Sequence, residues 1–535
     1  MKNISTVAFT VGLGILCLCI FGFSLTGHYV WDDVYLVQFH PSLRPWDGWK
    51  ALVLKDVWGG ATGRHTQLYH PLPMLSFWLE AQTWGLSVWR SRLLNVWMHG
   101  CCGLGIYVLL RRWSISAMYA WCGVFVFVSH PIVTEPVMWL TGRHDLMGVL
   151  FGICALAVWP NASKPNQPWL RVGCASGCVL LAFFCKEPYL VLPLLLFFQG
   201  ELQRDASALG KRRWLWYLLP ILALLVGIGW RTFLGISAQS ALLGRPVEFH
   251  AQSYTSILHH YLPLLFTWSD APTLSRFTQA GRVQMWISVL WVLSIWSVLL
   301  VLWWRRGRRE PVWGLLLFAG SSFLVLWSPH LLSMPMIGMF ANRYAYFPWL
   351  FLSMFGVGMI WKLGMQLQSS QRVQIRRIFR GLMSAVVCIL VCWGGWQTAL
   401  RAHDWQSNEH LYAADIARTP DNGLAYYHYG HALRVRLGCR RALPFFRQAT
   451  VLSPKYVRGW QNTVGCMIQL AMYREALPLA RRAAQMASYH PQNHYHLGLL
   501  LLQLGQTQQA KSALLEALAR NPRYLPALHL IRQIR

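Results

Sequence analysis

The stretch VAFTVGLGILCLCIFGFSL (Val7–Leu25) runs almost directly into GHYVWDDVYLV (Gly27–Val37). The first part is apolar for nearly the ~20 residues that a helix needs to cross a bilayer. The second part places two adjacent carboxylates, Asp32 and Asp33, just beyond the end of that helix. Acidic side chains at a membrane edge are costly to dehydrate and often mark function, but two solvated loop residues would give the same pattern.

The composition is that of a protein that crosses the membrane several times. Of the 535 residues, 55% are hydrophobic and only 13% are charged, a balance that is unusual for soluble domains. The net charge of +29 could indicate a nucleic-acid partner. However, many Lys and Arg residues cluster between apolar runs, where they orient membrane helices. We therefore predict a lipid bilayer, and no nucleic acid, as a partner, with the first apolar segment retained as a helix because no convincing cleavage site precedes Trp31.

Apolar runs in residues 1–400 predict about eleven membrane-spanning helices. The predicted spans are 7–26, 93–110, 115–130, 145–159, 172–185, 188–200, 214–230, 283–304, 312–328, 345–361 and 381–398. Every second connection between them is basic, for example at Arg111 and Arg112. By the positive-inside rule, these connections and the N-terminus face the cytoplasm.

The remaining connections then form outer loops. These loops cover residues 27–92, 130–145, 231–282 and 329–344. Within the third, the short apolar segment Ser253–Phe266 would break the charge alternation if it spanned, so we expect a re-entrant or interfacial helix there.

A polar, helical tail follows a linker at 401–419. Prolines at 420, 454, 491 and 522 suggest a repeat of about 34 residues, and the segment His490–Pro522 carries small residues at tetratricopeptide spacing, including Gly498 and Ala510. We predict a tetratricopeptide-repeat domain over 420–535, with a generic array of helical hairpins as the alternative. Eleven spans from a cytoplasmic N-terminus would place it on the outer, periplasmic side. Its excess of Lys and Arg suits either a solvated basic face or attraction to acidic partners and anionic headgroups.

The thirteen cysteines do not indicate a disulfide framework. Eleven lie in or beside apolar runs, where cysteine acts as a small hydrophobic residue. Only Cys439 and Cys466 fall in the polar tail, and no Cys/His spacing is typical of a metal site.

Acidic, histidine and basic residues recur at the helix ends of three predicted outer loops and in the stretch CKEPYLVLP (Cys185–Pro193), which we also expect to face outward. They are Asp32, Asp33, His130, Glu135, Arg143, Asp145, Lys186, Glu187 and Arg343. Each alone could be a helix-terminating turn, a local salt bridge or an interfacial anchor. Because all of them are predicted at one leaflet, we expect a single polar site that faces outward.

Such a site suits transfer of a sugar from a polyprenyl phosphate to an acceptor hydroxyl. A carboxylate can take the proton of the attacking hydroxyl, and Arg or Lys can hold the phosphate and stabilise the negative charge that grows as it leaves. A donor with a lipid tail and a sugar-phosphate head would reach a site that opens to both lipid and water.

The motifs VWDD, YHPLPMLSF, LLNVWMHG, HPIVTEPVMWLTGRHDLMGVLF, CKEPYLVLP and NRYAYFP precede the repeats in this order. Nearly the whole chain thereby resembles bacterial membrane glycosyltransferases of the GT-C type with C-terminal repeats. It is also similar to the animal transmembrane-and-tetratricopeptide-repeat O-mannosyltransferases. The resemblance implies an all-α fold, a polytopic GT-C-type helical domain followed by a repeat solenoid, in an integral protein of the bacterial inner membrane.

The resemblance also implies roles for the site residues. An inverting transferase of this kind would use Asp32 or Asp33 as the catalytic base, with the family pattern favouring Asp32. Arg143, Lys186 and Arg343 match positions assigned to the donor phosphate or to site architecture. His130, Glu135, Asp145 and Glu187 are expected to orient the acceptor or a metal ion, and relatives differ in whether they need a divalent cation. The chain departs from the pattern at His70, where relatives often have Arg.

Two other classes of function remain open. A non-catalytic membrane scaffold would recruit envelope partners through the repeats, which are binding surfaces, but would not need the acids and bases. A polyprenyl-linked glycan ligase would fit the donor, but such ligases typically rely on a large late outer loop, and the late loop at 329–344 is short. A transporter would show polar residues at mid-membrane depth or internal repeats. The repeats are expected to dock a protein or glycan acceptor, and the sequence identifies neither the acceptor nor the sugar.

Overall fold

The computed structural model describes residues 2–62, 68–160, 167–203, 214–236, 247–269, 310–328, 339–368 and 373–534, with scattered positions between 272 and 305. It divides into two compact units, Met1–Gln406 and Ser407–Arg535. Both are helical, and the short strands β1 (Ser275–Arg276) and β2 (Met339–Phe340) form an antiparallel pair in the first unit.

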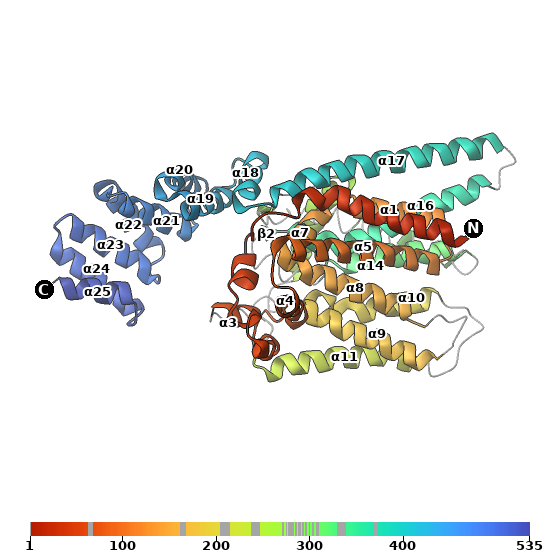
Figure 1. Ribbon diagram of the computed structural model, residues 1–535, viewed down its shortest axis with the longest axis horizontal. Coiled ribbons are helices and arrows are strands. Elements are labelled where there is room, and N and C mark those ends of the chain that lie inside the picture. Colours follow the sequence, from red (N-terminus) through yellow and green to blue (C-terminus); the bar gives the residue numbers. More distant parts are fainter. Residues whose placement is uncertain are drawn as a thin grey trace. The chain divides into compact units, whose positions relative to one another are not determined.

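Long apolar helices form the framework of the first unit. Figure 1 shows α5, α8, α9 and α11 running side by side, and α3, α4, α7 and β2 lying at one end of this bundle. The helices of this unit are α1 (Lys2–Phe21), α2 (Trp49–Leu54), α3 (Val57–Thr62), α4 (Pro71–Thr83), α5 (Val88–Arg112), α6 (Ala117–Val128), α7 (Thr134–Met138), α8 (Arg143–Val158), α9 (Pro168–Cys185), α10 (Leu192–Leu202), α11 (Trp214–Phe233), α12 (Val247–Thr267), α14 (Pro311–Val325), α16 (Tyr346–Gln368) and α17 (Val373–Asp404).

Seven helical segments among the described residues are long and apolar enough to cross a membrane, or eight if one bent pair counts as a span. They are Thr6–Ser24, Val88–Arg112, Leu140–Val158, Pro168–Cys185, Trp214–Phe233, Asn342–Leu367 and Gly381–Asp404, and the bent pair is Ala117–Val128 with Pro131–Met138. The chain is therefore an integral membrane protein.

The residues that the structure describes do not show the expected eleven spans. The prediction at 188–200 meets α10, of 11 residues, and the prediction at 312–328 meets α14, of 15 residues; both are shorter than the ~20 residues that a span requires. Most of the predicted span 283–304 and most of the outer loop 329–344 lie outside the described residues.

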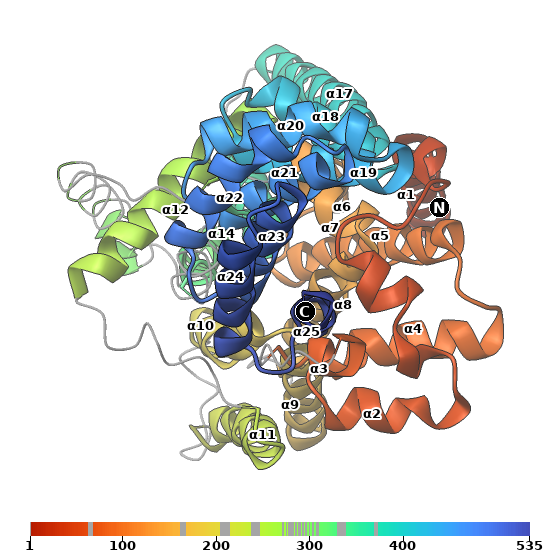
Figure 2. The same cartoon turned by 90° about the vertical axis from the view of Figure 1, so that its left-hand side faces the viewer.

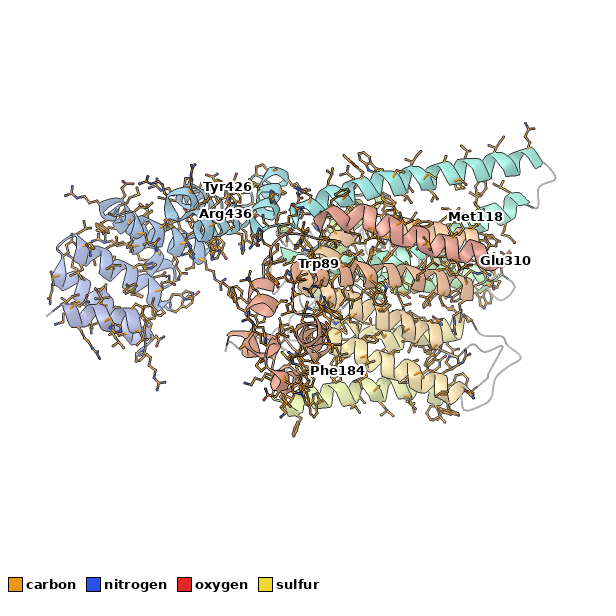
Figure 3. All side chains as sticks on the ribbon, viewed as in Figure 1. Trp89, Met118, Phe184, Glu310, Tyr426 and Arg436 are labelled. Carbon is orange, nitrogen blue, oxygen red and sulfur yellow. A yellow bond between two sulfur atoms is a disulfide. The ribbon has the colours of Figure 1, made fainter. Side chains whose placement is uncertain are left out.

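The first outer loop folds into a small core of its own. Leu36, Val37, Met74 and Phe77 are buried there and pack with Leu140, which precedes α8. Figure 2 shows α2 and α4 side by side in this region. The ring of Phe184 in α9, labelled in Figure 3, packs edge-on against Tyr69 with centroids 6.2 Å apart. Burying these apolar side chains stabilises the loop. The segment that follows α1 therefore packs against a folded core.

The second unit is an array of antiparallel helical hairpins. Its helices are α18 (Asn408–Arg418), α19 (Gly423–Leu437), α20 (Cys439–Leu452), α21 (Val457–Gln469), α22 (Tyr473–Met486), α23 (Pro491–Gln503), α24 (Thr507–Arg520) and α25 (Leu525–Gln533). The segment 401–419, expected to be a linker, is mostly helical, since α17 continues to Asp404 and α18 belongs to the second unit.

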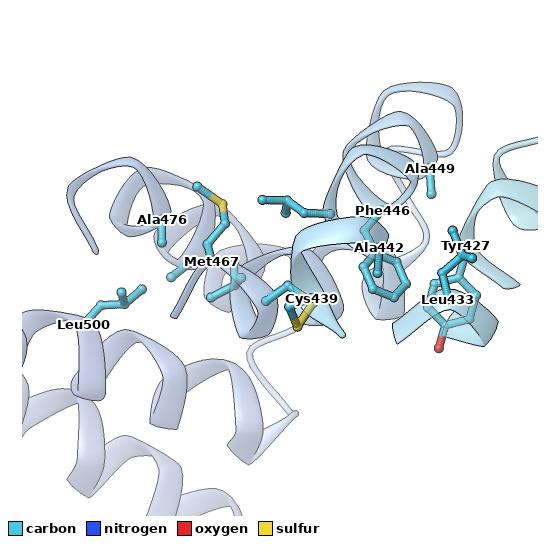
Figure 4. Close-up of a cluster of buried hydrophobic side chains, with 13 residues drawn as sticks. Tyr427, Leu433, Cys439, Ala442, Phe446, Ala449, Met467, Ala476 and Leu500 are labelled. Atoms are coloured by element: carbon cyan, nitrogen blue, oxygen red, sulfur yellow. A yellow bond between two sulfur atoms is a disulfide. The ribbon is translucent and has the colours of Figure 1, made fainter. Parts of the chain in front are cut away.

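Small residues allow the close helix contacts of the repeats. A Cβ on Gly430 would lie 3.0 Å from the ring of Phe446, and one on Gly498 would lie 2.8 Å from Leu514. Figure 4 shows the core around Ala442, Phe446 and Met467. The hairpins and their glycine positions are tetratricopeptide-like, as the spacing predicts. Cys439 and Cys466 in this core form a disulfide.

Candidate active site

The segment Trp31–Asp33, which carries the two adjacent aspartates, is called the acidic loop below. Asp33 is fully buried and anchors this loop to the start of α8. One carboxylate oxygen accepts hydrogen bonds from the Thr141 backbone N–H at 3.0 Å and from the Thr141 hydroxyl at 3.1 Å. The other accepts from the Leu140 N–H at 3.3 Å. Burial raises the pKa of Asp33 to about 7, against the lowering effect of these hydrogen bonds. Its oxygens are therefore occupied by the protein.

Asp32 has a different environment from its neighbour. It is partly exposed, and no hydrogen bond or ion pair to its carboxylate is found within the described ranges. Burial nevertheless raises the pKa of Asp32 to about 6, while the charge of Arg343 acts to lower it. A carboxylate with free lone pairs and a pKa near neutrality is suited to accept a proton from a hydroxyl.

The buried guanidinium of Arg92 in α5 holds the backbone on both sides of this loop. It donates to the carbonyl oxygens of Ser24 at 2.9 Å, Thr26 at 3.2 Å and His28 at 3.3 Å. It also donates to Met138 at 3.1 Å and Trp405 at 2.6 Å. One side chain thus ties the end of α1, the end of α7 and the end of α17 together.

Trp31 enters the acidic loop in a left-handed conformation, with φ 59°. A bulky residue rarely adopts this region without support from its surroundings. Its ring lies 5.2 Å from that of Trp139, and the guanidinium of Arg343 lies 5.4 Å and 5.0 Å from the two ring centroids. Trp31 therefore places Asp32 beside an arginine that aromatic rings hold in position.

Arg343 and Lys186 both lie close to the ring of Tyr344. The Arg343 guanidinium carbon lies 4.8 Å and the Lys186 Nζ 5.1 Å from the ring centroid. Arg343 pairs with Glu135, and Lys186 pairs with Asp145 at 2.6 Å. Two cations from distant parts of the sequence are thus brought close together.

A pocket lies against these ion pairs. It has about 310 Å³ of empty space, including space open to solvent, and its lining includes Asp145, Tyr189, Arg343 and Tyr344. The second oxygen of Glu135, Oε2, is buried without a hydrogen-bond partner within the described part of the chain. Arg343 can therefore interact with Asp32 and contribute to the pocket at the same time.

Arg143 lies deeper and is fully buried. It pairs with Glu80 and donates to Ser76 Oγ at 3.0 Å, Asn95 Oδ1 at 3.0 Å and the Ser91 carbonyl at 3.2 Å. Its donors are occupied inside the protein. The structure thus does not bring Arg143 together with Arg343 and Lys186 at the pocket.

His130 and Glu187 also have protein partners. His130 is fully buried, with Nδ1 accepting from the Ile132 N–H at 3.1 Å and Nε2 lying 3.2 Å from the Leu265 carbonyl. Glu187 contacts His70 at 2.9 Å and Arg231 at 2.8 Å. Burial opposes ionisation of Glu187, but the charges of His70 and Arg231 outweigh it and lower its pKa to about 2.

The four residues expected to orient an acceptor or a metal do not form one ligand set. Glu135 and Asp145 neutralise two different cations, while His130 and Glu187 bond elsewhere. In the part of the chain that the structure describes, no group of three or more His, Cys, Asp or Glu residues could hold a metal ion.

Sequence reasoning missed three buried polar residues near the site. Arg92 bonds directly to the backbone shortly before the acidic loop, and Glu80 pairs with Arg143; the signal for both was a charged residue inside an otherwise apolar helix pattern. His144 lies between Arg143 and Asp145, its ring 4.7 Å from that of His70. Its Nε2 is buried and has no partner among the described residues; no pattern in the sequence distinguished it from its neighbours.

The two units define an integral membrane protein with a polar site at helix ends and with tetratricopeptide-like repeats. The chain is a distant homologue of the O-mannosyl-transferases called TMTC. It is 22% identical over 504 residues to protein O-mannosyl-transferase TMTC3 of Homo sapiens, covering 86% of this chain and 53% of that protein. It is 23% identical over 597 residues to protein O-mannosyl-transferase Tmtc3 of Drosophila melanogaster, covering 93% of this chain and 62% of that protein.

The chain spans about half the length of the first of these relatives. No protein-family model matches it. Among solved structures, it is similar to YrrB, a TPR protein, with 17% identity, 31% of this chain and 94% of that chain covered, and a TM-score of 0.24.

Proposed function

We propose that this protein is a membrane glycosyltransferase that moves a sugar from a polyprenyl phosphate to an acceptor hydroxyl, on the face opposite the cytoplasm. The observation that carries the proposal is the position of Asp32 near Arg343, because Arg343 in turn lines the pocket. The Asp32 carboxylate has no protein hydrogen bond in the described ranges. The distant homology to proteins named O-mannosyl-transferases supports a hexose, with a protein hydroxyl as acceptor.

In the proposed reaction, Asp32 accepts the proton of the acceptor hydroxyl while the oxygen of that hydroxyl bonds to the anomeric carbon of the sugar. The bond from that carbon to the phosphate oxygen breaks, and polyprenyl phosphate leaves with the electron pair. Arg343 and Lys186, which both lie near the ring of Tyr344, would stabilise the growing negative charge. Their carboxylate partners keep both cations in place before the donor arrives.

Asp33, Arg92 and Arg143 act in this proposal as positioning residues. Asp33 bonds to Leu140 and Thr141 just before α8, and Arg143 at the start of α8 bonds to Glu80 in α4 and Asn95 in α5, so both hold the start of α8 in place. Holding reacting groups in place contributes on the order of 7–11 kcal/mol to lowering a barrier. This interpretation assigns Arg143 to site architecture rather than to the donor phosphate.

The test is an Asp32→Asn variant, assayed for transfer from a labelled polyprenyl-phosphate sugar in native membranes. Loss of a general base typically lowers the rate by about 10²–10⁴-fold. Asp47→Asn is the matched control, because Asp47 is an exposed acid of the same loop, and it should keep full activity. Full turnover by a folded Asp32→Asn protein would overturn the proposal.

A further inference from the structure

His144, in the first turn of α8, has a buried side chain that the proposed reaction does not use. Only 6% of its surface is exposed, and its Nε2 is buried without a hydrogen-bond partner among the described residues. Buried polar atoms nearly always have a partner in folded proteins. An imidazole nitrogen without one, next to a pocket, is therefore a candidate to bind a ligand.

The surroundings of His144 are those of an anion site. The groups whose charges act most strongly on its imidazole are His70, Lys186, Arg143 and Arg343, and each of them is cationic when charged. The Nε2 atom can donate a hydrogen bond, either as the neutral tautomer that carries its proton there or as the imidazolium. A donor placed among cations suits an anionic acceptor, and hydrogen bonds to a charged acceptor are the strong ones.

The ring of His144 is supported from behind by that of His70. The two ring centroids lie 4.7 Å apart. His70 is fixed in turn, because its Nε2 lies 2.9 Å from Glu187 Oε2 and Arg231 donates to Glu187 Oε1 at 2.8 Å. Arg231 also donates from Nε to the Ile236 carbonyl at 3.2 Å. Both oxygens of Glu187 therefore have protein partners, and His144 packs on a ring that other parts of the chain hold in place.

Three helices bring these residues to one place. His70 directly precedes α4, His144 is in the first turn of α8, and Lys186 directly follows α9; the three helices contact one another. Asp145, next to His144, pairs with Lys186 and lines the pocket. Helices α8 and α9 belong to segments long and apolar enough to cross a membrane, so His144 and Lys186 lie near the ends of spans. The phosphate of a lipid lies at that depth, just beyond the hydrocarbon core.

We propose that His144 binds the phosphate of the lipid-linked donor, with its Nε2 donating a hydrogen bond to a phosphoryl oxygen beside Lys186 and Arg343. This inference rests on the proposed function and adds a binding residue to its donor subsite. It gives an acceptor to a nitrogen that is buried among cations. His70 supports the ring of His144 in this arrangement and does not itself contact the phosphate.

The test measures binding of farnesyl phosphate, a short polyprenyl phosphate, to the full chain in detergent. A ligand that binds the folded protein raises its thermal unfolding midpoint in a concentration-dependent way. Wild type should respond to farnesyl phosphate but not to farnesol, which has the same tail without the phosphate. His144→Phe keeps a ring without a donor and should need about 10–100-fold more farnesyl phosphate, the loss expected for one hydrogen bond to a charged group. A folded His144→Phe protein with the wild-type response would overturn the proposal.

His144→Gln and His260→Phe are the matched controls. Glutamine keeps an N–H donor on a side chain of similar reach, so His144→Gln should restore most of the response, which a purely structural role of the ring does not predict. His260 also has a buried Nε2 without a partner in the described part of the chain, but its ring stacks on Phe340 and the charge that acts on it is that of His259. His260→Phe should respond like wild type. A folded His144→Gln protein without a response, or a loss in His260→Phe equal to that in His144→Phe, would overturn the proposal.

Two further comparisons separate this inference from the proposed function. Asp32→Asn should lose transfer but keep its response to farnesyl phosphate, because binding a phosphate needs no base. Wild-type binding by His144→Phe would reject the inference alone, whereas full transfer by Asp32→Asn would reject the function alone. Inorganic phosphate at the same concentration should give a much smaller shift, because it lacks the lipid tail. An equal shift would assign the site to free phosphate and overturn its link to the donor.

Discussion

At the scale of single residues, two adjacent aspartates have separate tasks because their surroundings differ. Three hydrogen bonds hold Asp33 against the turn before α8. Asp32, one position earlier, is partly exposed and near Arg343. Trp31, directly before the two acids, has a left-handed backbone, and Asp33 is buried while Asp32 remains partly exposed. A free carboxylate that is partly dehydrated is a stronger base than one in open water.

The pKa of Asp32 predicts how transfer depends on pH. Burial raises it from 3.8 to about 6, with Arg343 acting to lower it. Since only the ionised form can accept a proton, activity should fall as pH drops through about 6. The apparent kcat/KM should be about tenfold lower at pH 5 than at pH 7. A pH–rate profile on solubilised protein measures this.

The control for the pH profile is the residual activity of Asp32→Asn, which should not show the same fall. A wild-type profile with half-maximal activity near pH 4, the pKa range of an ordinary aspartate, would contradict the prediction that burial raises the pKa of Asp32.

At this scale the sequence predicted the types of residue better than their partners. Motif spacing identified Glu135 and Arg343, yet their ion pair joins positions 208 residues apart, which no local pattern encodes. His130 and Arg143 carry chemically suggestive side chains, but the structure fully buries both. Burial depends on how helices pack, and a helix-end motif looks the same whether its side chain faces a pocket or the interior.

At the scale of helices, α5 holds the ends of α1, α7 and α17 together through the hydrogen bonds of Arg92. Arg92→Lys should disrupt this support, because a lysine has three donors and no planar fork, while Arg92 serves five carbonyls. Leaving some of these buried groups unpaired should cost about 3 kcal/mol of stability. Thermal unfolding in detergent should show a lower midpoint, and transfer should weaken because the acidic loop loses its anchor.

Arg90→Lys is the control for that prediction, because Arg90 lies one half-turn away on α5 and is less buried. Its Nε bonds to the Ser87 hydroxyl at 3.0 Å near the helix start. An unfolding midpoint for Arg92→Lys equal to that of Arg90→Lys would exclude the five hydrogen bonds of Arg92 as a significant source of stability.

Helices of the repeats offer a matched pair of glycines. A Cβ on Gly498 would meet Leu514 at 2.8 Å, whereas one on Gly465 would meet only His496 at 3.7 Å. Gly498→Ala should therefore destabilise the repeats by about 1–3 kcal/mol through overpacking. Gly465→Ala should be neutral or stabilising by up to roughly 1 kcal/mol, through helix propensity. Protease resistance of the repeat unit in the full chain during heating would rank the two variants.

Hydropathy predicted that most helices of the first unit exist, but it did not predict how many of them are long enough to cross the membrane. Runs such as 188–200 and 312–328 are apolar throughout, yet α10 and α14 are too short to cross a bilayer. An apolar run indicates that its side chains avoid water, but it does not show whether they contact lipid or neighbouring helices. Repeats were easier to predict, because their small residues recur at fixed spacing.

At the scale of the whole molecule, the function proposed for the repeats is separable from the chemistry. If the repeats dock the acceptor, removing Ser407–Arg535 should leave donor cleavage and transfer to a small soluble hydroxyl largely intact. Transfer to the native acceptor should fall by more than about tenfold, since binding energy from remote groups would be lost. Gln406 is kept in this truncation because its carbonyl bonds to His28.

A scaffold without catalytic activity predicts the opposite pattern, and cells lacking the chain can decide between the two. We expect glycan mass spectrometry of the membrane and exported fractions to show a modification that wild-type protein restores and Asp32→Asn does not. A scaffold would need its repeats but tolerate the loss of one carboxylate, so Asp32→Asn would then restore every glycan while the truncated chain restored none. The charged residues that converge around Tyr344 and the pocket favour the first result, because a docking platform alone gains nothing from burying cations beside an unpaired acid.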